Sequence, residues 1–186
     1  MSLLKQVLEH NDKFVEEKAY EPYITDKVPN KKAVVFTCMD TRLVELLPKA
    51  MGFRNGDVKV VKNAGARITN SYDSVVQSIL IGLWQLKADE VIVVGHKDCG
   101  MAGLKGEATV EKMKANGISA DVLASVETAE GVNLNDWLSG FESVEDNVKN
   151  SVNKLKTHEL LPAGAKVHGL VIDPKTGKLD LVHEDE

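Results

Sequence analysis

Basic residues are in the minority in this chain of 186 residues, which has 23 lysines and arginines against 28 aspartates and glutamates. The net charge of −5 argues against a nucleic-acid-binding protein, because such proteins carry a basic patch or stripe. Long apolar runs are also missing: none approaches the roughly 18 residues that span a bilayer. Charged residues interrupt the N-terminal apolar positions before a signal-peptide core could form. We therefore expect a protein that binds neither nucleic acid nor membranes.

Cysteine is scarce, since Cys38 and Cys99 are the only two. They do not form a Cys-x-x-Cys redox pair. Val44 stands six residues after Cys38, where a cysteine phosphatase would carry an arginine. In a chain without export signals, two thiols indicate a reducing compartment, where they survive as ligands or nucleophiles. We therefore predict a cytoplasmic protein.

Apolar runs bounded by turn-forming residues predict five strands, at residues 33–37, 58–61, 91–94, 166–172 and 179–182. The spacing of apolar residues predicts helices over 2–18, from about 69 to 87 and, with breaks, over 107–158. Strands that alternate with helices and end in a hairpin predict an α/β fold. We expect a mainly parallel central sheet, with strand order about 2-1-3-4 and an antiparallel edge strand, flanked by helices.

We expect a single domain over residues 1–186, with an N-terminal helical arm at 1–27 and a helical segment at 105–160. The helix in the arm is amphipathic and is followed by two prolines, so we predict that it reaches across to a second subunit. The helix expected near 69–87 is apolar on more than one face, which predicts that the sheet and a partner chain both cover it.

Three soft side chains follow two of the predicted strands. Cys38 ends the first strand, and His96 and Cys99 lie in the loop that we expect after the third. Ligands of open α/β sheets collect beyond the carboxyl ends of the strands, so these residues are expected to meet if the two strands are neighbours. We expect His96 and Cys99 to bind one ion from a single helical turn. Two thiolates, one imidazole and an oxygen, from Asp40 or from water, form a ligand set for one Zn²⁺ per chain.

Three motifs resemble the signature of the β-class carbonic anhydrases, closest to the compact prokaryotic branch. They are Cys38-x-Asp40-x-Arg42, the Asn-Ala-Gly-Ala-Arg run at 63–67, and Gly95-His96-x-x-Cys99-Gly100. The resemblance runs from about residue 28 to the C-terminal hairpin and is weakest over 105–160. It implies zinc-dependent, reversible hydration of carbon dioxide to bicarbonate and a proton, by a zinc-bound hydroxide, in a homodimer or a dimer of dimers.

Asp40 has two candidate roles, and Arg42 decides between them. Asp40 either takes the fourth zinc position in a closed site or turns away and accepts a hydrogen bond from the water on the metal. A guanidinium binds a carboxylate through two parallel hydrogen bonds, so an Asp40–Arg42 pair favours the open site and makes both residues catalytic candidates. Gly100 is a candidate for binding the anionic product through its backbone N–H. Asp98 is expected to form local hydrogen bonds.

Two alternatives to carbon dioxide hydration stay open. The same zinc ligands would serve a hydrolase of carbon disulfide or carbonyl sulfide. If Asp40 ligates the metal permanently, the protein is instead a zinc-stabilised binding or sensor module without catalysis, because a structural zinc site has four protein ligands.

Overall fold

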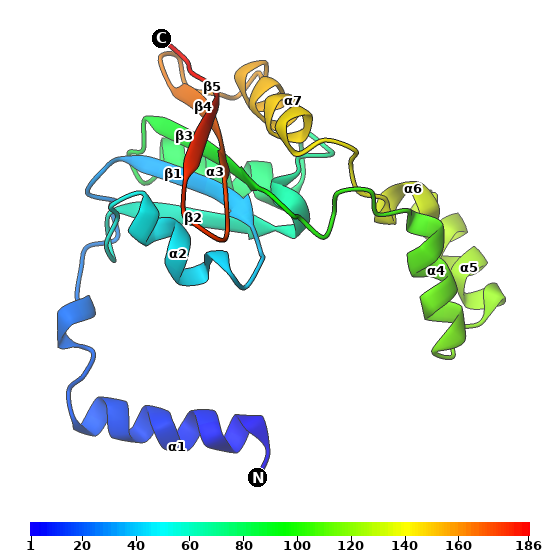
Figure 1. Ribbon diagram of the computed structural model, residues 1–186, viewed down its shortest axis with the longest axis horizontal. Coiled ribbons are helices and arrows are strands. Elements are labelled where there is room, and N and C mark those ends of the chain that lie inside the picture. The colour runs from blue at the N-terminus through cyan, green and yellow to red at the C-terminus, as the bar shows by residue number, and fades with distance from the viewer.

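The computed structural model describes all residues 1–186 and contains one five-stranded sheet (Figure 1). Its strands are β1 (Ala33–Cys38), β2 (Val58–Asn63), β3 (Glu90–His96), β4 (Lys166–Ile172) and β5 (Leu179–His183). They lie in the order β2-β1-β3-β4-β5, with parallel pairing as far as β4 and an antiparallel β4–β5 hairpin at the edge. The predicted α/β fold, strand order and antiparallel edge strand are confirmed.

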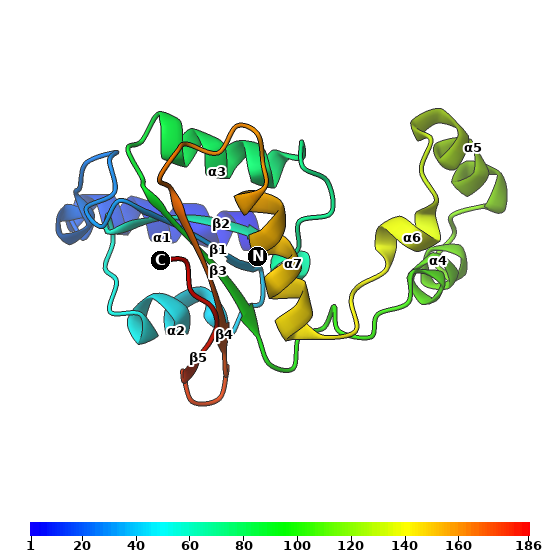
Figure 2. The same ribbon diagram turned by 90° about the horizontal axis from the view of Figure 1, so that it is seen from above.

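Helices cover both faces of this sheet (Figure 2). Helices α3 (Ser74–Trp84) and α7 (Val144–Lys156) pack on one face, and α2 (Leu43–Ala50) packs on the other. A parallel strand that is covered on both faces must be apolar at every position rather than at alternate ones. This explains why the central strands read as continuous apolar runs in the sequence. We did not predict α2.

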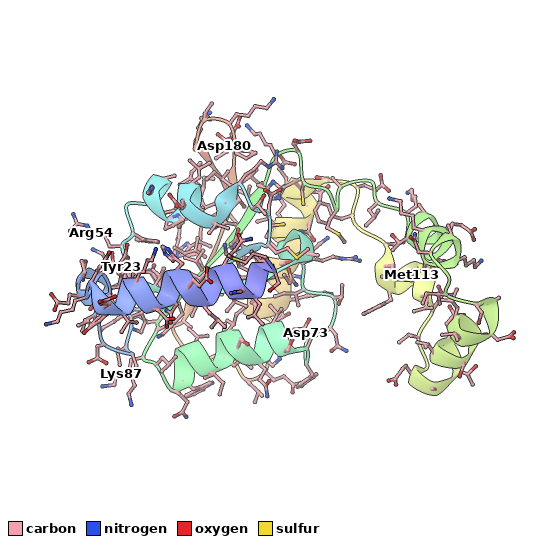
Figure 3. The ribbon with its side chains drawn as sticks, turned by 90° about the horizontal axis from the view of Figure 1, so that it is seen from below. Tyr23, Arg54, Asp73, Lys87, Met113 and Asp180 are labelled. Carbon is pink, nitrogen blue, oxygen red and sulfur yellow. The ribbon has the colours of Figure 1, made fainter.

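Helix α1 (Leu3–Glu16) lies apart from the sheet, and residues 17–32 connect it to β1 (Figure 1). Seen from below, the helix lies in front of the rest of the chain (Figure 3). Ser2 caps its first turn by accepting a hydrogen bond from the N–H of Lys5. None of its 14 residues is buried. The connector contains a short 3₁₀ turn, η1 (Glu21–Tyr23). The amphipathic helix is therefore present, but its apolar face has no cover within this chain.

Three short helices form a lobe beside the sheet, visible at the right of Figures 1 and 2. They are α4 (Gly106–Ala115), α5 (Ala120–Glu130) and α6 (Leu134–Leu138). The lobe has its own small core of three buried side chains, Val110, Leu123 and Leu134. The breaks that we predicted within 107–158 are present, at residues 116–119, 131–133 and 139–143. None of the helices in the structure has the combined length and apolarity needed to cross a membrane.

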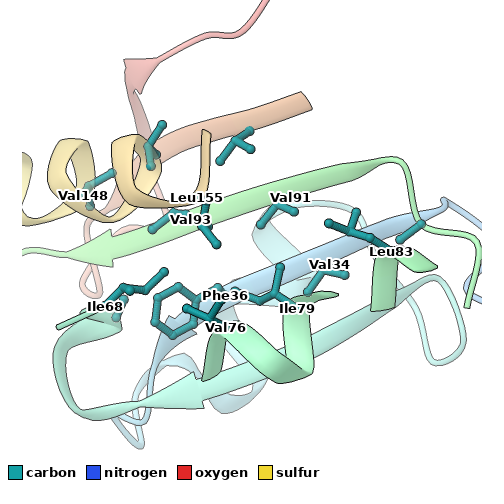
Figure 4. Packing of buried hydrophobic residues seen from close by; sticks show 14 of the residues in the cluster. Val34, Phe36, Ile68, Val76, Ile79, Leu83, Val91, Val93, Val148 and Leu155 are labelled. Carbon is teal, nitrogen blue, oxygen red and sulfur yellow. The ribbon is translucent and has the colours of Figure 1, made fainter. Parts of the chain in front are cut away.

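The main core lies between the sheet and the pair α3 and α7 (Figure 4). Val34 and Phe36 point into it from β1, whereas Val35 and Cys38 lie in a second cluster beneath α2. Successive residues of a strand face opposite sides of the sheet, which separates Val35 from Val34 and Phe36. Cys38, the last residue of the strand, departs from this alternation and is buried among the side chains of the second cluster.

Helix α3 is shorter than predicted and less completely covered. It begins after Asp73, whose side chain accepts a hydrogen bond from the N–H of the third residue of the helix at 2.9 Å. Ahead of it, the Asn70 side chain accepts from the N–H of Tyr72 at 2.8 Å, which holds a turn where we expected helix. The outward face stays exposed within this chain, including Trp84 at 60%.

Candidate metal centre

The side chains of Cys38, His96 and Cys99 converge at the carboxyl end of the sheet. Cys38 is the last residue of β1, and His96 is the last residue of β3, which pairs directly with β1. The three possible ligand atoms lie within 4.8 Å of one another, and all three residues are buried. Adjacent parallel strands therefore bring together residues that are far apart in the sequence, as predicted, and the three could hold one metal ion.

His96 presents one unpaired nitrogen to the two sulfurs. Its Nδ1 lies 2.9 Å from the carbonyl oxygen of Lys97, which fixes the ring orientation when Nδ1 carries the proton. Its Nε2 is buried without any hydrogen-bond partner and is the only such side-chain atom in the structure. A buried polar atom without a partner is costly. A metal ion bound to Nε2 and the two sulfurs would remove that cost.

The segment from His96 to Cys99 is a tight turn and not the helical turn that we expected. His96 still belongs to β3, and Lys97 and Asp98 make the turn. Asp98 has φ of 56°, in the left-handed region, where aspartate is tolerated better than most residues. This reversal brings the Cys99 sulfur back toward the strand end.

The two thiols have different acidities. Burial raises the pKa of Cys38, but the nearby His96 imidazole and the backbone N–H groups of Gly65 and Asp40 outweigh it and bring the pKa to about 7. Burial raises the pKa of Cys99, and the neighbouring Cys38 raises it further. One thiolate is thus readily available near neutral pH, and a bound cation would favour ionisation of the second.

Asp40 is bound by Arg42 and lies beside His96. The Arg42 Nε and Nη2 atoms donate to the two carboxylate oxygens of Asp40 at 2.9 and 2.8 Å, and the Arg42 backbone N–H donates to Oδ1 at 2.9 Å. These bonds to Arg42 outweigh the effect of burial and lower the pKa of Asp40 to about 2. Asp40 Oδ2 lies 3.7 Å from His96 Nε2. A carboxylate oxygen is therefore held next to the cluster in its ionised form.

Arg42 also bridges to the turn that carries Cys99. Its Nη1 donates to Asp98 Oδ2, and its Nη2 donates to the Asp98 carbonyl oxygen, both at 2.9 Å. The expectation that Asp98 forms local hydrogen bonds was wrong, because its side-chain partner, Arg42, lies 56 residues away in the sequence. No signal in the sequence identified this contact. Arg42 consequently ties the loop after β1 to the loop after β3.

The 63–67 run forms a turn against the Cys38 sulfur. After β2, the short 3₁₀ turn η2 (Ala64–Ala66) places the N–H of Gly65 3.3 Å from Cys38 Sγ. Gly65 has φ of 83°, and a Cβ atom there would lie 2.8 Å from Phe141 Cε1, so glycine is required. The Asn63 side chain closes the turn by bonding the backbone N–H and carbonyl of Arg67, at 3.1 and 2.7 Å.

Gly100 lies directly after Cys99 and is exposed. Its backbone N–H has no acceptor within the protein. The group is therefore free to donate to a ligand.

Comparisons with known proteins agree with this arrangement. A family model described as carbonic anhydrase matches residues 33–179. YvdA of Bacillus subtilis (strain 168), which has a provisional carbonic anhydrase name, is 54% identical over 182 residues, covering 98% of this chain and 92% of YvdA. The crystal structure of β-carbonic anhydrase isoform I of Trichomonas vaginalis superposes with a TM-score of 0.85 at 30% identity and 100% coverage of both chains. A carbon disulfide hydrolase of Acidithiobacillus thiooxidans is 27% identical over 164 residues, covering 84% of this chain and 80% of the hydrolase.

Proposed function

Because this chain belongs to the β class of the carbonic anhydrase family, we propose that it is a zinc enzyme that interconverts carbon dioxide and bicarbonate. The observation that carries the proposal is the buried, unpaired Nε2 of His96 beside two thiols. An ordinary core histidine would have found a hydrogen-bond partner for this atom. Its position beside two sulfurs fits a metal ligand.

Zn²⁺ is the ion that this donor set fits best, with one ion per chain. Cys38, His96 and Cys99 would hold it, since two sulfurs and one imidazole suit a borderline-soft ion that prefers tetrahedral coordination. Bound there, zinc would act as a Lewis acid that lets a water molecule lose its proton near neutral pH. Two thiolates cancel the charge of a divalent cation, so we expect this effect to be weaker here and the activity to rise toward alkaline pH.

Asp40 would orient the attacking water by accepting a hydrogen bond from it. Arg42 keeps Asp40 ionised and turned to one side through three hydrogen bonds. For Asp40 to become a fourth protein ligand, its carboxylate would have to give up these bonds. We therefore propose an open site in which Asp40 positions the nucleophile and Arg42 positions Asp40. The same pairing speaks against the alternative of a permanently closed, non-catalytic zinc module.

The product site is proposed at Gly100. Bicarbonate is an anion, and an exposed backbone N–H without a protein acceptor, on the residue after Cys99, can donate to it. Carbon disulfide or carbonyl sulfide remains the second candidate substrate class, because the Acidithiobacillus relative is named for hydrolysis of carbon disulfide.

The test is a stopped-flow assay of carbon dioxide hydration across pH, on protein of measured zinc content, beside assays of carbon disulfide and carbonyl sulfide hydrolysis. We expect hydration to dominate and to increase from neutral to alkaline pH. With its pKa lowered to about 2, Asp40 is ionised throughout that range and adds no inflection of its own. Zinc-loaded protein that fails to hydrate carbon dioxide even at alkaline pH would overturn the proposal. Dominant carbon disulfide turnover would select the second candidate.

We further propose that the protein is cytoplasmic and that its active form is a homodimer or a dimer of such dimers. The apolar face of α1 is exposed in this chain, with Leu4 and Leu8 at 68% and 55%. Monomeric proteins seldom leave a contiguous face of this kind in water. A second copy of the chain offers a cover through two-fold exchange of the arms. Within each subunit, residues 1–186 would act as one domain that includes the 1–27 arm and the 105–160 helical segment.

A further inference from the structure

Helix α7 carries two buried polar side chains on the face that packs against the sheet. Asn147 is 4% exposed and Ser151 is 1% exposed, and they lie one helical turn apart. The same face supplies the apolar residues Val148, Val152 and Leu155 to the main core. Burying a polar group among apolar ones is unfavourable unless it is hydrogen-bonded. The hydrogen-bond partners of Asn147 and Ser151 therefore indicate the role of these two side chains.

Both side chains bind the backbone of the turn after β2. Asn147 Nδ2 donates to the carbonyl oxygen of Gly65 at 2.9 Å and lies 3.4 Å from that of Ala66. Ser151 Oγ accepts from the N–H of Ile68 at 3.2 Å and lies 3.3 Å from the Ala66 carbonyl oxygen. Helix α7 thus holds this turn through hydrogen bonds between segments that are more than 80 residues apart in the sequence.

The turn needs such a restraint. Ala66 has φ of 52°, in the left-handed region that alanine rarely adopts, and Gly65 next to it has φ of 83°. Strained residues of this kind persist only where the surroundings hold them in place. The N–H that the turn directs at Cys38 Sγ belongs to Gly65, whose carbonyl accepts from Asn147.

We propose that Asn147 is a positioning residue of the metal centre, with Ser151 as a weaker second. Asn147 fixes Gly65 so that its N–H stays bonded to the Cys38 sulfur. That bond withdraws charge from one of the two thiolates and holds it in a geometry ready for the ion. The inference rests on the proposed function, since it assumes that Cys38 ligates a metal. It assigns to α7 a role in metal affinity in addition to packing.

The experiment compares Asn147→Leu with Val152→Ala in the full-length protein. Leucine is similar in size to asparagine but cannot donate to Gly65. Val152 is buried on the same helix, and its apolar side chain makes no hydrogen bond to the turn, so its truncation lowers stability without removing such a bond. Zinc affinity is measured by competition with a chelator. Cobalt-substituted protein reports the sulfur-to-metal charge-transfer band, and melting temperatures show the loss of stability in each variant.

We expect Asn147→Leu to weaken zinc binding about tenfold, because it loosens the Gly65 N–H bond to Cys38, and loss of an outer hydrogen bond to a metal ligand costs about 10- to 100-fold in affinity. The charge-transfer band moves to longer wavelength, because a thiolate without its N–H donor gives up charge more easily. Val152→Ala changes the melting temperature but neither metal readout. Equal affinities and equal bands in the two variants would overturn the inference.

Two further outcomes are distinguishable. If Asn147→Leu does not fold, Ser151→Ala removes one oxygen and is expected to shift both readouts by less in the same direction, and no shift in it would overturn the inference. If the wild-type protein binds neither zinc nor cobalt, the proposed function itself fails, and the inference falls with it.

Discussion

Strand β1 and helix α1 both carry apolar residues in clear patterns, and they lie in opposite environments. All six residues of β1 are buried, between helices on both faces of the sheet. None of the 14 residues of α1 is buried. A hydrophobic pattern thus predicts that a surface is buried, but it does not identify the surface that covers it. For β1 the cover comes from this chain and fixes Cys38 at its end; for α1 we infer that it comes from a second chain.

The largest effect is expected where β1 ends. Cys38→Ser replaces a soft thiolate by a hydroxyl that stays protonated at neutral pH and binds zinc poorly. We expect zinc content to fall from one per chain toward zero and carbon dioxide hydration to fall to background. Elemental analysis and stopped-flow kinetics measure the two. Met39→Ser is the matched control, because Met39 is the next residue and 65% exposed. A Cys38→Ser protein with full zinc content would remove Cys38 from the ligand set.

The next largest effect is expected at Arg42, which joins the loops that follow β1 and β3. Arg42→Ala frees the Asp40 carboxylate and breaks the bridge to Asp98. We expect kcat/KM for carbon dioxide to fall about 100-fold, as for a catalytic group displaced by about an ångström, with zinc content unchanged. The pKa of Asp40 rises from about 2 toward its ordinary value. Arg54→Ala, an exposed arginine elsewhere, serves as control. Unaltered kinetics in Arg42→Ala would show that Asp40 needs no guanidinium to position it.

Features that depend on local apolar patterns could be predicted from the sequence, whereas features that depend on contacts between distant segments could not. Strands with a continuous apolar pattern and the rule that ligands lie beyond strand ends were enough to place Cys38 and His96 together. Helix α2 was missed because its eight residues include Pro48 and give too short a pattern. The Arg42–Asp98 bridge and the hydrogen bond from Asn147 to Gly65 were missed, because both join segments that are far apart in the sequence. Such polar contacts produce no periodic pattern in a single sequence.

A smaller effect is expected at Gly65, on the turn that meets the end of β1. Gly65→Ala forces alanine into a left-handed conformation and places its Cβ 2.8 Å from the Phe141 ring. Gly164→Ala is the control for the conformational cost alone, since Gly164 has φ of 84° with open space around it. We expect about 1 kcal/mol of destabilisation from the control and about 2–3 kcal/mol from Gly65→Ala, measured by urea unfolding. Equal losses in the two variants would show that contact with Phe141 does not constrain the turn.

The smallest effect on the fold of the subunit is expected in α1. Substitutions there test whether a second chain covers this helix, in contrast to β1, which its own chain covers. Replacing Leu4 and Leu8 together by glutamate leaves the core untouched, because both side chains are already exposed. Covering each leucine at an interface would contribute about 1.5–3 kcal/mol, so the double variant is expected to lose most of the association energy of the arm. Light scattering should then give a mass of about 20.3 kDa for the variant and about twice that for the wild type, with zinc content the same in both. Lys5→Glu makes the same change in net charge away from the apolar face and should stay dimeric. A wild-type monomer, or a Leu4→Glu, Leu8→Glu protein that remains dimeric, would mean that α1 is an apolar helix without a partner.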